Sequence, residues 1–336
     1  MGGLTNIFQI GAAALGVDVG TGAIKVAEAR RSGRGIELVR YGIGATPPGA
    51  VADGLIIDRA AAAAALAALL RKSEIRRREA VVSINGPNVL ARLLHLPPIP
   101  EAEVKQAIRW EAERHLPFPV EDAVLDAQVV GEVTEDGQRQ LEVLLAAAPE
   151  SMALACIEVL QGAGLRAAAI ELSALAMVRS LTMRPLPGTV AMVNLGASTT
   201  EVAIVRGGVP QVTRTIAEGA GALLEEAAAA SGSGVVAVPA AALGGVLDAL
   251  TAQLRRSFDF YRAQYGGQQV DRILLCGGGA RAESLDRHLA LEMEIPVVVA
   301  SPLDGIHLGR RLDEDAVSRA APQLVTAVGL ALRTLI

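Results

Sequence analysis

The sequence predicts an α/β fold built from two similar halves with a cleft between them. A strand, a turn rich in glycine and hydroxyl residues, and a second strand occupy residues 15–29. The same pattern returns at residues 190–205. A supersecondary pattern that repeats within one chain indicates an internal duplication. Strands and helices also alternate along both halves, which is typical of layered α/β proteins.

The composition limits the functions that the chain can have. It has 336 residues, of which 51% are hydrophobic and only 2% aromatic, and its formal net charge is −5. This length suffices for about two domains with a sizeable core. The acidic balance and the scarcity of aromatic residues argue against nucleic acid as a partner. Cys156 and Cys276 offer neither a disulfide framework nor a thiolate metal site. Because no stretch reaches the roughly 20 apolar residues of a spanning helix, we expect a cytoplasmic protein.

The first half is expected to start with three strands, followed by one helix and one strand. The strands lie at 15–19, 23–29, 36–41 and 81–84, and the helix lies at 59–72. Asp58 stands where the alanine-rich helix needs an N-cap, and Arg71 and Lys72 suit the negative end of its dipole. The run Arg76–Arg78 is interpreted as a solvated turn rather than a lipid contact.

A distinct block follows at residues 85–169, which we interpret as an α+β module of β-α-β-β-α-β type. Strands are expected at 91–96, 123–133, 140–147 and 165–170, and helices at 101–115 and 149–162. The first helix has apolar residues at helical spacing and stops at Pro117 and Pro119. A further helix at 173–183 and the prolines that follow it mark the boundary to the second half.

The second half repeats the opening pattern and then adds helices around a glycine run. Strands are expected at 190–195, 201–205, 209–215, 273–276 and 297–300. Helices are expected at 219–230, at 240–265, from Glu283 onward and at 321–335.

The first glycine turn has the residue types of a phosphate and metal site. Gly20 lets backbone N–H groups approach an anion, and Thr21 can donate a hydroxyl hydrogen bond. Asp18, at the end of a strand, can hold Mg²⁺ through water. Lys25 either offsets phosphate charge or points outward. An ordinary tight hairpin explains this turn, taken alone, equally well.

Two further glycine motifs lie in the second half. The turn at 194–200 has Gly196 and three hydroxyl residues, but Asn194 stands where a carboxylate is expected. The run 277–279 lies between a strand and a helix, where its backbone can approach a nucleobase or an α-phosphate. Each motif alone is weak, but their order on opposite halves indicates a nucleotide cleft.

That order resembles the sugar kinase, Hsp70 and actin superfamily. The stretches 96–120, 126–131 and 256–261 are also similar to the PilM family, the actin-like proteins of type IV pilus assembly, which are related in fold to the cell-division protein FtsA. The resemblance covers nearly the whole chain. It implies an actin-like ATPase fold of two RNase H-like halves, with an FtsA-type 1C α+β subdomain and a reduced 2B subdomain.

The resemblance implies a division of the chain into four parts. These are 1–84 plus 170–187 (1A), 85–169 (1C), 188–217 plus 271–336 (2A), and 218–270 (2B), which looks shortened.

The resemblance also implies ATP and Mg²⁺ as ligands. Carried over residue by residue, the nucleotide site comprises Gly20, Thr21, Lys25, Gly196, Thr199, Arg256, Ser257, Gly277, Gly278 and Gly279, with Asp18 as the metal residue. Asn194 in place of an aspartate and the shortened 2B part put hydrolysis in doubt. We therefore assign no catalytic residue and expect at most a weak ATPase.

The partner implied by the resemblance is the N-terminal cytoplasmic tail of a PilN-like inner-membrane protein. We expect this tail, a few apolar residues around an Asn, to lie extended in a groove between the module and the first half. Strands such as 91–96 and 141–145 would form its walls. Other pilus platform or motor proteins are further expected partners, self-association stays open, and the membrane is reached only through partners.

Alternative functions remain at this point. An ATP-dependent small-molecule kinase would need a base aspartate near the second turn, and Asn194 counts against it. An FtsA-like, membrane-tethered filament protein would need an amphipathic helix after a linker, but the helix at 321–335 has the apolar composition of a core element. A related type II secretion system is also compatible with the sequence.

Overall fold

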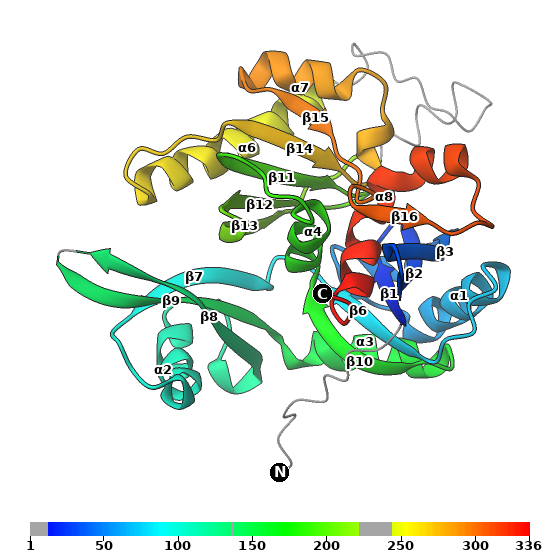
Figure 1. The fold of residues 1–336 in the computed structure, drawn as a ribbon, viewed down its shortest axis with the longest axis horizontal. Coiled ribbons are helices and arrows are strands. Elements are labelled where there is room, and N and C mark those ends of the chain that lie inside the picture. The colour runs from blue at the N-terminus through cyan, green and yellow to red at the C-terminus, as the bar shows by residue number, and fades with distance from the viewer. Residues whose placement is uncertain (1–12, 136, 222–243) are drawn as a thin grey trace.

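The computed structural model describes residues 13–135, 137–221 and 244–336, and it contains two large sheets joined through central helices (Figure 1). The first sheet has the order β10-β6-β1-β2-β3-β16. Its strands are β1 (Ala13–Val19), β2 (Ala23–Ser32), β3 (Gly35–Ala45), β6 (Glu79–Ile84), β10 (Arg166–Leu172) and β16 (Ile306–Leu308).

The second sheet has the order β15-β14-β11-β12-β13-β7-β9-β8. Its strands are β7 (Leu90–Leu96), β8 (Ala123–Glu135), β9 (Gln138–Pro149), β11 (Thr189–Leu195), β12 (Thr200–Arg206), β13 (Val209–Ile216), β14 (Arg272–Cys276) and β15 (Val297–Val299). A short hairpin of β4 (Val51–Ala52) and β5 (Leu55–Ile56) stands apart from both sheets.

The predicted duplication is confirmed by the strand directions. In the first sheet β1, β2 and β3 are antiparallel, and β6 and β10 continue the sheet in parallel beyond β1. In the second sheet β11, β12 and β13 are antiparallel, and β14 and β15 continue it in parallel beyond β11. Both halves therefore have one topology, and their two glycine turns lie at equivalent places.

Seven α-helices are described. They are α1 (Arg59–Lys72), α2 (Glu101–Glu113), α3 (Glu150–Gly162), α4 (Ser173–Leu181), α6 (Gly244–Gln264), α7 (Leu285–Met293) and α8 (Glu314–Leu332). Helix α1 begins after Asp58, whose carboxylate accepts a hydrogen bond from the Ala61 amide at 2.9 Å, as the sequence predicts. The helix expected at 219–230 lies almost wholly outside the described residues.

Helix α8 begins seven residues before the predicted helix at 321–335. Asp313 caps its first turn by accepting from the amides of Asp315 and Ala316, and the helix then continues through Pro322. The strand β16 and the hairpin of β4 and β5 were also not predicted, because each is too short to show periodicity.

The sequence places the module beside the first half and does not predict that it pairs with the second half. Its sheet of β7, β9 and β8 joins the second half, because β7 pairs with β13 at Arg92 and Val212. The Thr213 hydroxyl secures this junction by donating to the Ala91 carbonyl at 2.8 Å. Helix α2 covers one face of this sheet, where Ile108 packs with Val143.

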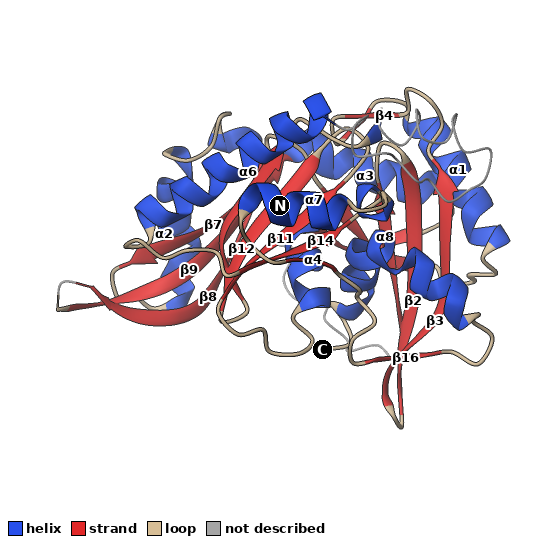
Figure 2. Cartoon of the chain, turned by 90° about the horizontal axis from the view of Figure 1, so that it is seen from above, coloured by secondary structure: helices blue, strands red, loops and turns tan. Residues whose placement is uncertain are grey.

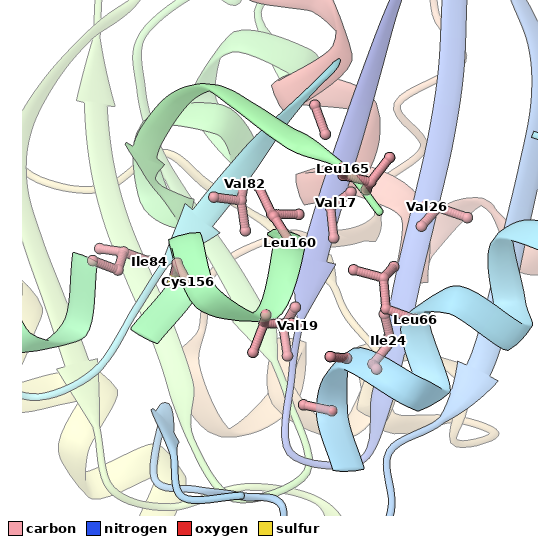
Figure 3. Packing of buried hydrophobic residues seen from close by; sticks show 14 of the residues in the cluster. Val17, Val19, Ile24, Val26, Leu66, Val82, Ile84, Cys156, Leu160 and Leu165 are labelled. Atoms are coloured by element: carbon pink, nitrogen blue, oxygen red, sulfur yellow. The ribbon is translucent and has the colours of Figure 1, made fainter. Parts of the chain in front are cut away.

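Helix α3 and strand β10, which we expected inside the module, lie with the first half. Strand β10 pairs in parallel with β6, and α3 packs beside α1 on the first sheet. In Figure 3, Leu160 of α3 and Leu66 of α1 extend into the same apolar cluster as Val17 and Val82. Burial of these apolar side chains holds both helices against the sheet.

Helix α8 approaches its neighbours so closely that glycine is required at two contacts. A Cβ on Gly16 of β1 would lie 2.0 Å from the Ala327 carbonyl oxygen of α8. A Cβ on Gly329 of α8 would lie 1.8 Å from the Ala176 carbonyl oxygen of α4. These contacts are backbone to backbone, so no rotation of a side chain can relieve a substitution.

We therefore expect Gly329→Ala to lower the free energy of unfolding by about 2 kcal/mol or more, because the methyl group forces α4 and α8 apart. Gly33→Ala is the matched control, since no atom lies within 4 Å of the added Cβ. It should change stability by less than about 0.5 kcal/mol. Urea unfolding of both variants measures this, and equal stability would contradict the close packing of α4 and α8.

Candidate functional site

A cavity of about 340 Å³ lies between the two halves, where their glycine turns meet. It is lined by residues of both turns, of the glycine run and of α8. The predicted site residues among them are Asp18, Gly20, Thr21, Lys25, Gly196, Thr199, Gly277 and Gly278. The structure thus brings most of the predicted nucleotide site together in one cleft.

The first turn presents a carboxylate whose two oxygens are both held. Asp18 lies opposite Lys25 across the β1–β2 hairpin, and the Lys25 ammonium donates to one carboxylate oxygen at 3.0 Å. The Ser83 hydroxyl on β6 donates to the other oxygen at 2.9 Å. Asp18 is buried, and Lys25 therefore points into the cleft rather than outward.

The two turns touch across the cleft. The hydroxyl oxygens of Thr21 and Ser198 are 2.8 Å apart, and a Cβ on Gly22 would lie 2.9 Å from the Ala197 Cβ. Thr199 lines the cavity, and its carbonyl accepts a hydrogen bond from the Gly196 amide at 3.0 Å, which closes the second turn. A phosphate group between the turns would exchange the contact between hydroxyls for contacts with its own oxygens.

The glycine run contains one position open to a ligand and two that packing requires. Gly277 has a φ of 90°, and a Cβ there would lie 2.4 Å from the Asn194 side-chain oxygen. A Cβ on Gly279 would lie 2.4 Å from Leu195 Cγ, and Gly279 does not line the cavity. Gly278 has ordinary helical dihedral angles and faces the cleft.

Arg256 and Ser257, predicted to border a nucleoside, do not line the cavity. The Ser257 hydroxyl is buried and donates to the Gln253 carbonyl of its own helix at 2.9 Å. It also accepts from Arg214 of β13 at 3.3 Å. Arg256 is exposed on α6. The structure therefore places both residues on a helix face away from the described part of the cleft.

A carboxyl group that the sequence analysis missed lies in the cleft at Glu201. It stands on β12 directly opposite Asn194, whose amide donates to it at 3.1 Å. The Ser173 hydroxyl at the start of α4 donates to its other oxygen. The second half therefore does present a carboxyl group, one strand away from the expected position. An isolated acidic residue in an apolar strand, immediately after the turn, was the available signal.

Burial raises the pKa of Glu201 to about 7. This value is a net result: burial has the largest effect and the Asp18 carboxylate also raises the pKa, whereas the hydrogen bonds from Ser173 and Asn194 and the positive charge of Lys25 lower it. A carboxyl group with this pKa changes its charge in the physiological range.

A second cavity, of about 370 Å³, lies between the module and the first half. Strand β8, the edge strand of the second sheet, forms one wall, and β10, the edge strand of the first sheet, forms the other together with α4. We call this cavity the edge groove. Its apolar lining includes Val124, Ala127, Val130, Leu144, Ile170, Leu172, Leu175 and Val178.

The predicted groove walls are partly confirmed. Strand β9 contributes Leu144. The other predicted wall, 91–96, belongs to β7, which lies inside the sheet between β13 and β9 and does not line the groove.

A buried charge cluster forms part of the lining of the edge groove. Glu171 of β10 accepts from Arg179 of α4 at 2.7 Å and from Arg333 at 3.0 Å. Arg179 also donates to the Gly329 carbonyl of α8 at 3.1 Å. Because Glu171 is almost fully buried, these pairs fix charged groups at a set position beside apolar walls.

None of the described helices has the length and apolar character needed to cross a bilayer. The His, Cys, Asp and Glu side chains of the described residues form no group of three or more able to hold a metal ion.

Comparison with known proteins gives a consistent family match. A family model described as type IV pilus assembly protein PilM matches residues 16–335. Among solved structures, a chain of a PilM–PilN type IV pilus biogenesis complex is 27% identical, with a TM-score of 0.82, covering 96% of this chain and 98% of that one.

More distant structures share the fold. The ethanolamine utilization protein EutJ from Carboxydothermus hydrogenoformans is 18% identical with a TM-score of 0.53, covering 96% of this chain and 90% of that one. A nucleotide-free diol dehydratase-reactivating factor is 8% identical with a TM-score of 0.52, covering 96% and 99%. These matches, together with the duplicated topology, show an actin-like α/β fold.

The raised pKa of Glu201 predicts a pH-dependent stability. The folded protein holds the proton more tightly than the unfolded chain, whose Glu has the ordinary pKa of 4.5. The stability that this proton contributes is therefore present below about pH 4.5 and lost as the pH rises through about 7. Glu201→Gln, which mimics the neutral carboxyl, should match the native protein near pH 5 and exceed it by about 2 kcal/mol near pH 8.

Urea unfolding of both proteins at the two pH values provides the measurement. A stability difference that does not change with pH would contradict a proton on Glu201.

Proposed function

Because the chain belongs to the PilM family of type IV pilus assembly proteins, we propose that it is a scaffold that binds the N-terminal tail of a PilN-like protein in the edge groove. The proposal rests on one observation. The groove is lined by β8 and β10, which are the edge strands of two different sheets, and by the adjoining strand β9.

A free sheet edge carries N–H and C=O groups that an extended peptide can pair with. Addition of a strand to such an edge is a common way to bind peptides, because backbone hydrogen bonds give affinity and side-chain pockets give specificity. Here a peptide between β8 and β10 would find a strand edge on either side. Alternate side chains of the peptide would then meet the apolar walls formed by Leu144 and Leu175.

The charge cluster in the groove lining suits a polar residue in an otherwise apolar tail. Arg179 and Arg333 already bind Glu171, so the cluster is held in place without a ligand. The amide of an Asn carries both donor and acceptor atoms and can hydrogen-bond to such a group without bringing an uncompensated charge into the groove. Bound through a membrane protein in this way, the chain would be held at the inner membrane.

The cleft between the halves is proposed to bind ATP with Mg²⁺. Its volume of about 340 Å³ lies in the usual range of ligand pockets. Its lining suits a phosphate chain, because the glycine turns of both halves, the Lys25 ammonium and two hydroxyls meet there. Asp18 and Glu201 would face the metal ion, which would neutralise phosphate charge when bound.

A ligand between the turns would act on the angle between the halves. Thr21 and Ser198 contact each other directly, so phosphate binding must separate them. A ligand that prefers one spacing of the two turns shifts the population toward that spacing. The carboxyl group of Glu201 also weakens the argument from Asn194 against turnover, since a carboxylate is present in the second half.

We expect a synthetic tail peptide of a PilN-like partner to bind with micromolar affinity, roughly −8 kcal/mol, because a short disordered segment loses entropy on binding. Val124→Asp should weaken this binding at least about tenfold, since it places a charge in the apolar groove. Val124 is 46% exposed, so the variant should fold. Isothermal titration calorimetry measures the affinity.

Trp110→Asp is the matched control, because Trp110 is 69% exposed on α2 and does not line the groove. It should leave the affinity unchanged. Equal weakening by both substitutions, or by neither, would contradict peptide binding in the edge groove.

For the cleft, we expect Gly278→Asp to abolish binding of Mg²⁺–ATP without unfolding the protein, because a carboxylate facing the cleft repels the phosphate groups. Gly33→Asp, on the open β2–β3 hairpin, is the control and should bind normally. Binding of a fluorescent ATP analogue, together with thermal unfolding, reports both properties. A folded Gly278→Asp protein with unchanged affinity would show that the glycine run serves packing alone.

A further inference from the structure

A cationic basin of about 910 Å³ lies on the first half, away from both sites described above. It is bounded by the β2–β3 hairpin, the end of α1 and the segment from β16 to α8. Its cationic side chains are Arg30, Arg34, Arg40, Lys72, Arg310 and Arg311, and its carboxylates are Glu37 and Glu74. We refer to this surface as the basin.

The basin is positive in a protein that is acidic overall. Six cations against two carboxylates give it a net charge of +4, whereas the whole chain carries −5. Such a concentration of one charge sign creates a local field that attracts anions.

Four of these cations are not neutralised within the described structure. Arg30 pairs with Glu37 at 2.9 Å, and Arg40 pairs with Glu28 at 3.2 Å. Among the described residues, no carboxylate forms an ion pair with the remaining four, which are Arg34, Lys72, Arg310 and Arg311. All four side chains are exposed.

The rim of the basin is held in shape by contacts between distant segments. Strand β16 pairs in parallel with β3, and the His307 ring nitrogen lies 2.8 Å from the Arg34 carbonyl oxygen. The Gly309 amide donates to the Leu38 carbonyl at 2.8 Å. The turns that carry Arg34, Arg310 and Arg311 are therefore held in place by backbone pairing and hydrogen bonds beside them.

We propose that the basin binds the phosphate headgroups of anionic phospholipids, so that the chain contacts the membrane directly as well as through a partner. The four unpaired cations are exposed and spread over three separate elements. This distribution suits several headgroups at a surface better than one small phosphate, which is usually held by convergent, buried donors.

The position of the basin agrees with a membrane-facing side. Figure 2 shows the β2–β3 hairpin, strand β16 and the C-terminus on the same side of the molecule. Arg333 of the edge groove lies three residues before the C-terminal Ile336. A residue that lines the groove is therefore close in sequence to the terminus on the side of the basin. This orientation rests on the proposed function, but the charge of the basin does not.

The test measures sedimentation of the full chain, without any tail peptide, with vesicles of phosphatidylcholine alone or mixed with phosphatidylglycerol. We expect binding only to the mixed vesicles and a decline of binding as salt is added. Arg310→Gln/Arg311→Gln should weaken the partition about 25-fold, because each basic residue near an anionic surface contributes about fivefold.

Arg109→Gln/Arg287→Gln is the control, since it removes the same charge from two exposed positions on α2 and α7. It should retain vesicle binding. No binding to mixed vesicles, or equal losses in both double variants, would overturn the proposal. The proposal would also be overturned if calorimetry showed that the chain binds free tripolyphosphate but does not bind the vesicles. That result would favour a soluble phosphate ligand. Because the vesicle experiment contains no tail peptide, a negative result would not contradict peptide binding in the edge groove.

Discussion

The close packing of helix α8 is the contact on which both candidate sites depend. Its backbone touches β1 at Gly16 and α4 at Gly329, where only glycine leaves room. Its Pro322 carbonyl accepts a hydrogen bond from Gly277 at 2.7 Å, which holds the start of the glycine run. The same helix lines the cleft with Thr326. One buried helix therefore positions the first sheet, the linker helix α4 and the second half relative to one another.

Helix α4 is shared by the cleft and the edge groove. Its first residue, Ser173, donates a hydrogen bond to Glu201 in the cleft. Farther along, Leu175 and Val178 line the groove, and Arg179 binds Glu171 in the charge cluster of its lining. A change in the charge or position of Glu201 acts on the start of a helix whose other face forms a groove wall. The proposed nucleotide and peptide sites thus meet at one structural element.

Local patterns in the sequence predict much of this fold, whereas its long-range pairings escape prediction. The Asp58 cap and the repeated glycine turns are local features, and both were correct. The pairing of β7 with β13 depends on residues far apart in sequence, so the sequence did not indicate that the module continues the second sheet. Glu201 was missed because the carboxylate was expected at position 194, although the register of the β11–β12 hairpin places Glu201 directly opposite Asn194. Gly279 has the right motif, but it is needed for packing against Leu195.

The central claim is that an extended peptide adds to a sheet edge in the edge groove. Hydrogen exchange of backbone amides, measured with and without the tail peptide of a PilN-like partner, tests it most directly. The account predicts that added protection concentrates in β8 and β10, which are edge strands that line the groove. Interior strands such as β9 should exchange as before. Protection confined to α2 or to the cleft, with no change in β8 and β10, would contradict the claim.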